Sequence, residues 1–316
     1  MSTQTLDRPA AAPNRAVELT LLFVLAGLWG GSYTFIKLGV ETIPPFTLIT
    51  ARTLIAGLVL LAVMRWRGLR LPRDLAAWRL FVVQACLNSV VPFTLIAWAE
   101  RSVDAGLATI LSSTSPIFVA LLSCLSASTE RLPGLRLAGI AAGLAGTVLI
   151  VGTQAMTGFG EQLWAQLALV AASICYGGAA LFGRSFKGLD PIMPAAGSLL
   201  CGALVLLPLS LILDRPWTLT PSAQSIQALI ALSLVSTALA FVIYFRLIAR
   251  LGSVATTSVA YLRVPTGVLI GMVFLGEALA PTAWAGLGLV IIGVMAMTLP
   301  VRSHAATKPR RSRRRC

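Results

Sequence analysis

The 316 residues of the chain are 57% hydrophobic and only 11% charged, with a formal net charge of +14. A water-soluble domain carries about 25% charged residues, so this composition argues against a soluble globular protein and favours an integral helical membrane protein. The single histidine, His304, lies in a polar C-terminal segment, and no P-loop sequence occurs. We therefore expect no catalytic residues, no metal site, no cofactor and no enzymatic activity.

In chain order, ten apolar runs are each long enough to cross a bilayer as a helix, and short connectors with turn residues separate them. We expect a disordered cytoplasmic N-tail over 1–17, without a cleaved signal peptide, and a basic cytoplasmic C-tail over 301–316. The predicted spans are 18–39, 46–64, 79–98, 105–127, 135–153, 163–183, 192–213, 224–245, 254–275 and 283–300.

The basic residues are unevenly distributed among the connectors. Nearly all of the 25 lysines and arginines lie in the two tails and in alternate connectors, whereas the other connectors hold only Arg101 and Arg215. Cytoplasmic segments of membrane proteins are enriched in Lys and Arg, so both termini are predicted to be cytoplasmic. This topology accounts for the net charge, and we expect no nucleic-acid partner. The predominance of arginine over lysine favours a bacterial origin and hence the bacterial inner (cytoplasmic) membrane.

The two halves of the chain share landmarks. A shift of 147 residues carries Pro44 onto Pro191 and aligns several glycines. Each copy holds five spans, an odd number, so the second copy is predicted to insert upside down relative to the first. Inverted repeats that meet around a midplane site are typical of secondary transporters. We predict a first five-helix repeat over 18–153 and a second, inverted five-helix repeat over 154–300.

Residues 28–37, LWGGSYTFIK, resemble the first-span signature of EamA-type carriers of the drug/metabolite transporter superfamily. Ile43-Pro44-Pro45-Phe46, followed by Arg52, is similar to the next part of that signature, and the segments 129–133 and 275–279 are similar to the ends of the family's two repeats. The resemblance extends over about residues 20–299. It implies a ten-helix carrier of small metabolites, often amino acids or related compounds, that usually moves them outward.

Three cations lie inside predicted spans, whereas no carboxylate lies at mid-membrane depth. Arg263 is near the midplane of the ninth span, Arg52 is in the second and Lys37 is near the outer end of the first. Charges within a membrane are costly and usually face a cavity or a partner. Each cation is a candidate for substrate binding. The alternatives are a structural hydrogen bond for Arg263, a pair with Glu41 or a neighbouring helix for Arg52, and snorkelling to the headgroups for Lys37.

Polar, aromatic and proline residues supply further candidates. Prolines in the third, fourth and ninth spans are predicted to interrupt helices, and the freed carbonyls are tolerated where they line a cavity. Interrupted helices at corresponding places in two repeats point to a transporter site, although simple kinks in a packed bundle are the alternative. Aromatic residues near span ends could instead belong to interfacial belts. The candidate substrate-binding residues are Arg263, Arg52, Lys37, Asn88, Trp98, Tyr176, Tyr244 and Tyr261, and the candidate helix-break or gating residues are Pro116, Pro265 and Pro92.

The sequence thus predicts an all-α integral membrane protein with ten transmembrane helices. Buried cations without a buried carboxylate favour anions or the carboxylate of a zwitterion, so we predict a secondary-active exporter of amino acids or related carboxylated metabolites, working by alternating access. The alternatives are a carrier of drugs or of nucleotide or phosphorylated sugars, and a membrane protein that does not transport. The expected partners are membrane lipids and the small-molecule substrate, and the sequence does not imply a homodimer.

Overall fold

The computed structural model of the chain describes residues 15–125, 134–156, 160–186, 188–244, 246–247, 250 and 259–298. Throughout these ranges the secondary structure consists of helices joined by short turns, without a strand. The predicted all-α fold class is therefore confirmed for the described part of the chain.

The first half folds into helices that follow the predicted spans closely. They are α1 (Arg15–Val40), α2 (Pro45–Trp66), α3 (Leu75–Ala85), α4 (Val91–Ala99), α5 (Ala105–Ser112), α6 (Ser115–Leu125) and α7 (Gly134–Met156). The second half folds in the same manner. Its helices are α8 (Glu161–Phe182), α9 (Ile192–Leu209), α10 (Ala223–Ser233), α12 (Val259–Leu275) and α13 (Pro281–Thr298).

Seven helical stretches among the described residues are long and apolar enough to cross a membrane. They coincide with the first four and with the sixth, seventh and eighth predicted spans. The other three predicted spans contain shorter apolar helices, Leu137–Ile150, Leu262–Leu275 and Pro281–Gly293. The chain is therefore a multi-pass membrane protein.

Local sequence signals explain where several helices begin. Pro45 occupies the first turn of α2, where its missing N–H needs no acceptor. Asp74 precedes α3 and its carboxylate accepts a hydrogen bond from the backbone N–H of Ala77 at 2.8 Å. Ser222 caps α10 in the same way by accepting from the N–H of Ser225 at 3.1 Å. Turn chemistry in the connectors thus sets the helix ends.

Two of the three predicted proline breaks coincide with real irregularities. Pro92 lies in the first turn of α4, directly after a π-helical segment, Cys86–Val90. Pro116 lies in the first turn of α6, where the chain turns at Ser113 and Thr114 and separates α5 from α6. At Pro116 the proline is tolerated because the N–H it lacks would have no partner at a helix start, whereas at Pro92 the helix continues through the π-helical turn from Leu75 to Ala99.

The prediction of an interruption at Pro265 is wrong, because α12 continues through this proline from Val259 to Leu275. A proline removes one hydrogen bond from a helix without always ending it, and side-chain hydroxyls can compensate in a membrane. Thr266, the next residue, donates its hydroxyl to the carbonyl of Leu262 at 2.7 Å, so the turn after the proline keeps its local hydrogen bonds. Residues 251–258, which precede α12, lie outside the described residues.

Two further π-helical segments occur among the described residues, Ser210–Asp214 after α9 and Leu234–Leu239 after α10. A shift of 147 residues carries Cys86–Val90 onto positions 233–237, so Cys86–Val90 and Leu234–Leu239 lie at corresponding places in the two halves. π-Helical turns are rare and are often found at functional sites.

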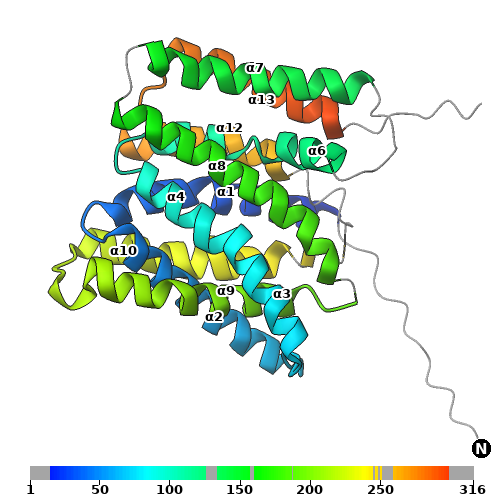
Figure 1. Cartoon of the computed structure of the whole chain (residues 1–316), viewed down its shortest axis with the longest axis vertical. Coiled ribbons are helices and arrows are strands. Elements are labelled where there is room, and N and C mark those ends of the chain that lie inside the picture. Colours follow the sequence, from blue (N-terminus) through cyan, green and yellow to red (C-terminus); the bar gives the residue numbers. More distant parts are fainter. Residues whose placement is uncertain are drawn as a thin grey trace, which may run out of the picture.

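The contacts between helices are repeated in the two halves, so that equivalent helices of the two halves pack on equivalent partners. In the first half α1 packs on α12 and on α10, and in the second half α8 packs on α5–α6 and on α4. The pairs α2–α9 and α7–α13 each join equivalent helices of the two halves. Figure 1 shows α7 beside α13 along one side of the bundle, at the top of the view, with α2, α3 and α9 along the opposite side.

The α1–α12 pair requires a glycine. A Cβ atom added to Gly30 would lie 2.8 Å from the backbone nitrogen of Gly267 and 2.9 Å from the carbonyl oxygen of Arg263. Both atoms belong to the backbone, so no side chain could move aside. Small residues at helix interfaces allow this close approach in membrane proteins.

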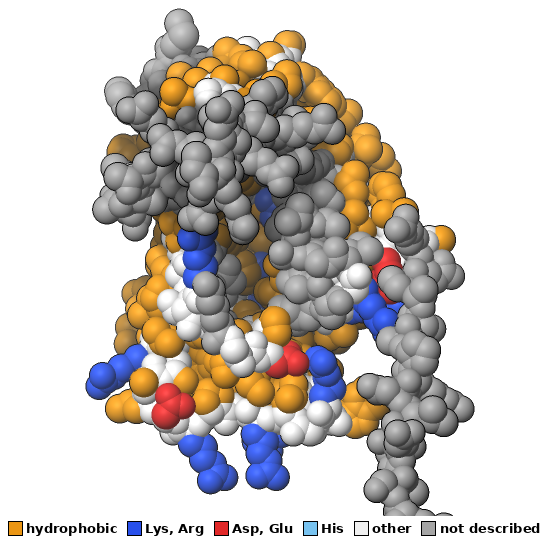
Figure 2. Space-filling model, turned by 90° about the vertical axis from the view of Figure 1, so that its right-hand side faces the viewer, with side chains coloured by type: hydrophobic (Ala, Val, Ile, Leu, Met, Phe, Trp, Pro, Cys, Tyr) orange, Lys and Arg blue, Asp and Glu red, His pale blue; other side chains and the backbone are white. Residues whose placement is uncertain are grey.

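Many large hydrophobic side chains are exposed on the outer surface of the described helices. Large hydrophobic side chains such as Phe23, Leu58 and Phe274 are exposed on different helices. In Figure 2 hydrophobic side chains cover much of the visible outer flank, while Lys and Arg side chains project from the lower edge. An apolar surface of this extent fits contact with lipid.

Candidate substrate site

A cavity of about 300 Å³ lies within the bundle between helices of both halves. Helices α1, α2, α4, α6, α8 and α12 and both corresponding π-helical segments contribute side chains to it. The lining residues are Trp29, Ser32, Tyr33, Arg52, Asn88, Phe93, Ser115, Tyr176, Ser236, Thr237, Phe241, Tyr244 and Arg263. We call it the central cavity.

Arg52 is fixed against one wall of the central cavity. Its side chain on α2 is only 5% exposed, and Nε donates a hydrogen bond to the hydroxyl of Thr237 at 3.0 Å. The guanidinium carbon lies 3.9 Å from the centre of the Phe93 ring, a cation–π contact. Thr237 in turn donates its hydroxyl to the carbonyl of Leu232 at 2.7 Å. These contacts hold the planar face of the guanidinium and leave its other N–H groups available to a ligand.

Arg263 enters the central cavity from α12. Its Nη2 donates a hydrogen bond to the hydroxyl of Ser113 at 2.9 Å. Ser113 lies in the turn that separates α5 from α6. Its Nε is buried and has no hydrogen-bond partner among the described residues. A buried donor without a partner is costly, and a ligand that accepts a hydrogen bond would remove that cost.

Aromatic rings form the rest of the wall. Trp29 lies against Tyr244, with ring centres 5.3 Å apart, and against Phe241 at 6.4 Å. On the other side Phe93 contacts Tyr176 at 6.4 Å in an edge-to-face arrangement. The lining thus combines two arginines, hydroxyl groups and aromatic rings, with no aspartate or glutamate. Such a site attracts a carboxylate or another anion and provides apolar surface for the remainder of a ligand.

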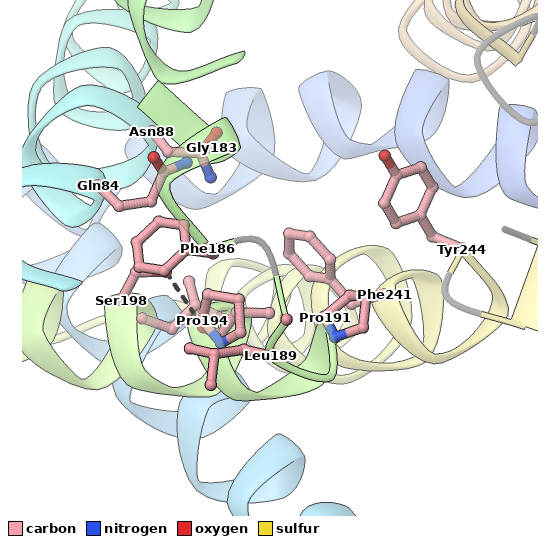
Figure 3. A pocket seen from close by; sticks show the side chains of 13 residues that line it. Gln84, Asn88, Gly183, Phe186, Leu189, Pro191, Pro194, Ser198, Phe241 and Tyr244 are labelled. Atoms are coloured by element: carbon pink, nitrogen blue, oxygen red, sulfur yellow. Dashed lines mark hydrogen bonds between the residues drawn. The ribbon is translucent and has the colours of Figure 1, made fainter. Parts of the chain in front are cut away.

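A second, larger cavity of about 460 Å³ adjoins the central one, and Asn88, Phe241 and Tyr244 line both. In Figure 3 Gln84 and Asn88 lie on one side of this hollow and Tyr244 on the opposite side, with Phe241 between them. Residues of the connector between α8 and α9, among them Gly188 and Pro191, also line it. We call this second cavity the vestibule.

The vestibule opens at one defined end of the bundle. Arg67, directly after α2, pairs with Asp190 of the α8–α9 connector at 3.6 Å, so this connector lies at the C-terminal end of α2. The turn between α1 and α2 lies at the other end, since α2 has 22 residues and rises about 33 Å. The vestibule end is the one that the charge distribution predicts to be cytoplasmic.

Polar contacts hold the opposite end together. Lys37, in the last turn of α1, donates a hydrogen bond to the carbonyl of Val103 at 2.8 Å. The carboxylate of Glu277, after α12, accepts from the backbone N–H groups of Ala105 at 2.7 Å and Gly106 at 2.8 Å, at the start of α5. A small pocket of about 160 Å³ at this end shares no lining residue with the central cavity.

The structure brings together most of the predicted substrate-binding residues. Arg263, Arg52, Asn88, Tyr176 and Tyr244 all line the central cavity. Arg52 also contacts a neighbouring helix, which is the alternative considered for it, but its partner is Thr237 and no ion pair with Glu41 occurs among the described residues.

Trp98 and Lys37 are not among the residues that line it. Trp98 is 42% exposed on α4. Lys37 donates to the carbonyl of Val103 at the end of the bundle opposite the vestibule, which we call the closed end. The side chain of Tyr261 lies outside the described residues. Of the predicted helix breaks, Pro116 is next to the lining residue Ser115 and Pro92 is next to Phe93.

Several lining residues were not predicted from sequence. They are Ser32, Tyr33, Phe93, Ser236, Thr237 and Phe241. Apolar and hydroxyl residues abound in every span, so residue type alone does not distinguish the ones that face a cavity. The shift between the two halves was a usable signal, because it places Ser236 and Thr237 near the position of Asn88.

No group of three or more His, Cys, Asp and Glu side chains that could hold a metal ion occurs among the described residues. The site is therefore built from arginines, hydroxyls and aromatic rings.

Known proteins with similar sequences are transporters. The chain is 29% identical over 278 residues to the uncharacterized inner membrane transporter YedA of Escherichia coli, which covers 88% of this chain and 89% of that protein. It is 28% identical over 303 residues to a probable terminal-alkyne amino-acid exporter of Streptantibioticus cattleyicolor, which covers 94% and 99% of the two chains. Both relatives are named as transporters.

A solved crystal structure shares the fold with a TM-score of 0.62 at 21% identity, over 92% of this chain and 100% of that one. The sequence profile of the EamA-like transporter family matches residues 17–152 and again residues 163–299. Two successive matches confirm the resemblance seen in the sequence motifs and the presence of two repeats. The chain belongs to the EamA-like transporter family.

Proposed function

We propose that this protein is a secondary-active exporter of amino acids or related carboxylated metabolites, located in the inner membrane of a bacterium. The observation that carries the proposal is the pair of arginines, Arg52 and Arg263, that line one cavity without an acidic residue among its lining side chains. A carboxylate in the central cavity would satisfy the unpaired Nε of Arg263 and the free N–H groups of Arg52.

The aromatic rings define the other half of the proposed substrate. Trp29, Tyr244 and Phe241 form a continuous aromatic wall that can hold an apolar side chain or, through cation–π contacts, an ammonium group. A zwitterionic amino acid would therefore bind with its carboxylate toward the arginines. A lipophilic cation would face two positive charges with no counterion, which disfavours it.

The two ends of the bundle fit one stage of alternating access. The vestibule connects the central cavity with the predicted cytoplasmic end, while the bonds of Lys37 and Glu277 close the other end. In this arrangement substrate enters from the cytoplasm. The second stage would close the vestibule and open the opposite end, as expected for inverted repeats with both termini in the cytoplasm. The named function of the S. cattleyicolor relative, amino-acid export, supports the same direction.

Counterflow in proteoliposomes tests this function. Purified protein is offered labelled amino acids, organic anions, phosphorylated sugars and organic cations. We expect uptake of zwitterions or carboxylates, abolished in Arg263→Ala and retained in Arg101→Ala, which removes an exposed arginine away from the cavity. Uptake of cations alone would contradict the proposal. Uptake of phosphorylated sugars alone would keep the arginine site but replace the substrate class.

A further inference from the structure

Glu100 is an unusual acidic residue, and the proposed transport step does not use it. It directly follows α4, and its backbone N–H still donates to the carbonyl of Ile96 at 2.9 Å. Its side chain is 0% exposed, and neither carboxylate oxygen has a hydrogen-bond partner among the described residues. An ionised carboxylate buried without partners is strongly disfavoured, and such a group is held as the neutral acid instead.

The charged groups around Glu100 do not neutralise it directly. Lys37 from α1 directs its ammonium to the carbonyl of Val103, and Glu277 from beyond α12 directs both carboxylate oxygens to Ala105 and Gly106. The salt bridges of the described residues are Arg67–Asp190 and Arg246–Glu18, so Glu100 takes part in none of them.

Three charged groups nevertheless act on Glu100 through space, namely Lys37, Glu277 and Arg52 of α2. The other helix packed on α4 is α8, whose titratable group there is the phenol of Tyr176 beside Arg52. Burial raises the pKa of the Glu100 carboxyl well above its ordinary value, Lys37 opposes this rise, and Glu277 adds to it.

The burial of Glu100 depends on the closed end of the bundle. Glu100, Val103 and the start of α5 form one short turn, and the bonds of Lys37 and Glu277 fasten that turn to helices of both halves. Opening this end must break those bonds and admit water to the turn. The carboxyl would then be hydrated beside a lysine, which favours the ionised form.

We propose that Glu100 is the proton-binding site of this carrier, which takes up a proton as this end closes and releases it as this end opens. The inference rests on the proposed alternating-access cycle. On closing, an O–H bond forms between a Glu100 oxygen and a proton from the water at that end. On opening, the same bond breaks and the proton returns to that water, so acid outside the cell favours the closed end.

Linkage gives the sign and size of the effect. The closed form has the raised pKa, so closure is fully favoured below the ordinary pKa of a glutamate, about 4.3, and is lost as the pH rises toward the raised value. One proton is involved, so the ratio of closed to open molecules should fall up to about tenfold for each pH unit within that window.

Spin-label distance measurements on the full chain in nanodiscs test the proposal. Labels at Ser102 and Ala280, which line the small pocket at this end from the two repeats, report opening in a variant whose native cysteines are replaced by serine. We expect the closed distance to give way to a longer one as the pH rises from about 5 to about 8. Glu100→Gln, which mimics the neutral acid, should keep the closed distance throughout. Asp104→Asn, which alters an exposed neighbour, should behave like the wild type.

A pH response that is absent from the wild type, or equal in Glu100→Gln and the wild type, would overturn the proposal. If Glu100→Gln does not fold, infrared spectroscopy of the wild type provides the second measurement, since a protonated buried carboxyl has a C=O stretching band that disappears when it ionises. That band must be lost across the same pH range as the closed distance. Neither measurement uses a substrate. The pH-dependent closing would therefore be seen even if the substrate class proposed above were wrong and the counterflow assay failed.

Discussion

The two ends of the bundle are held together by different kinds of contact. At the closed end, Glu277 reaches from the second repeat to backbone N–H groups of the first, and Lys37 binds a carbonyl between helices. At the vestibule end the contacts are ion pairs between side chains, the exposed pair Arg67–Asp190 at 3.6 Å and the pair Arg246–Glu18 at 3.0 Å, whose glutamate is buried. Exposed ion pairs contribute about 0–1 kcal/mol, whereas hydrogen bonds to charged groups that are shielded from water contribute more. The comparison teaches that the closed end is held through backbone groups and the vestibule end through pairs of side chains.

The largest effect is expected at Arg52, in the central cavity that lies between the two ends. Arg52→Ala removes the guanidinium that Thr237 and Phe93 hold in place, so a carboxylate substrate should lose about 2–5 kcal/mol of binding and counterflow should fall to background. Arg52→Lys keeps the charge but not the planar donor group and should recover part of the activity. Equal activity of Arg52→Ala and the wild type would remove Arg52 from the site.

The close contact between α1 and α12 is expected to tolerate no side chain at position 30. Gly30→Ala places a methyl group against the backbone of Gly267 and Arg263 and should cost about 1–3 kcal/mol of stability, seen as a lower Tm in detergent. Gly27→Ala on the same helix is the matched control, since an added Cβ there meets nothing within 4 Å. A similar Tm for both variants would contradict the close approach.

Weakening the closed end should change the balance between the two ends. Glu277→Gln leaves one acceptor oxygen for two backbone N–H groups and should cost the closed state about 1.5 kcal/mol, roughly tenfold in the population of open molecules. The Ser102–Ala280 spin-label pair measures this shift directly. An unchanged distance distribution would show that the Glu277 bonds do not hold this end closed.

The smallest effect is expected at the vestibule. Asn88 lines both cavities, and Asn88→Ala removes one neutral hydrogen-bonding group from the route. We expect a rise in the KM of counterflow of only a few-fold, corresponding to about 0.5–1 kcal/mol, with the maximal rate retained. A loss as large as that of Arg52→Ala would place Asn88 in the binding site itself.

Much of the fold was predictable from the sequence because long apolar runs and turn residues fix the helices in a membrane. The start of α2 at Pro45 and the break before Pro116 follow directly from such signals. Pro265 shows the limit of this reasoning, since α12 continues through it although a proline removes one backbone hydrogen bond.

The site was predictable only where a residue was costly to bury. Arg52 and Arg263 stand out because a cation inside a membrane needs a reason, and both line the cavity. Trp98 was chosen by residue type and is exposed, because type does not reveal which face of a helix is turned inward. Thr237 and Phe93 could not be selected from many similar residues, although they hold Arg52 in place.

The two corresponding π-helical segments, Cys86–Val90 and Leu234–Leu239, bear on the origin of the two repeats. Each amounts to one extra residue accommodated within an α-helix, and each supplies lining residues to the central cavity. Two independent insertions at equivalent places would be a coincidence, whereas one insertion in an ancestor of half the length accounts for both. We therefore infer that the widened turn predates the gene duplication and that each repeat brought its own copy of it to the cavity.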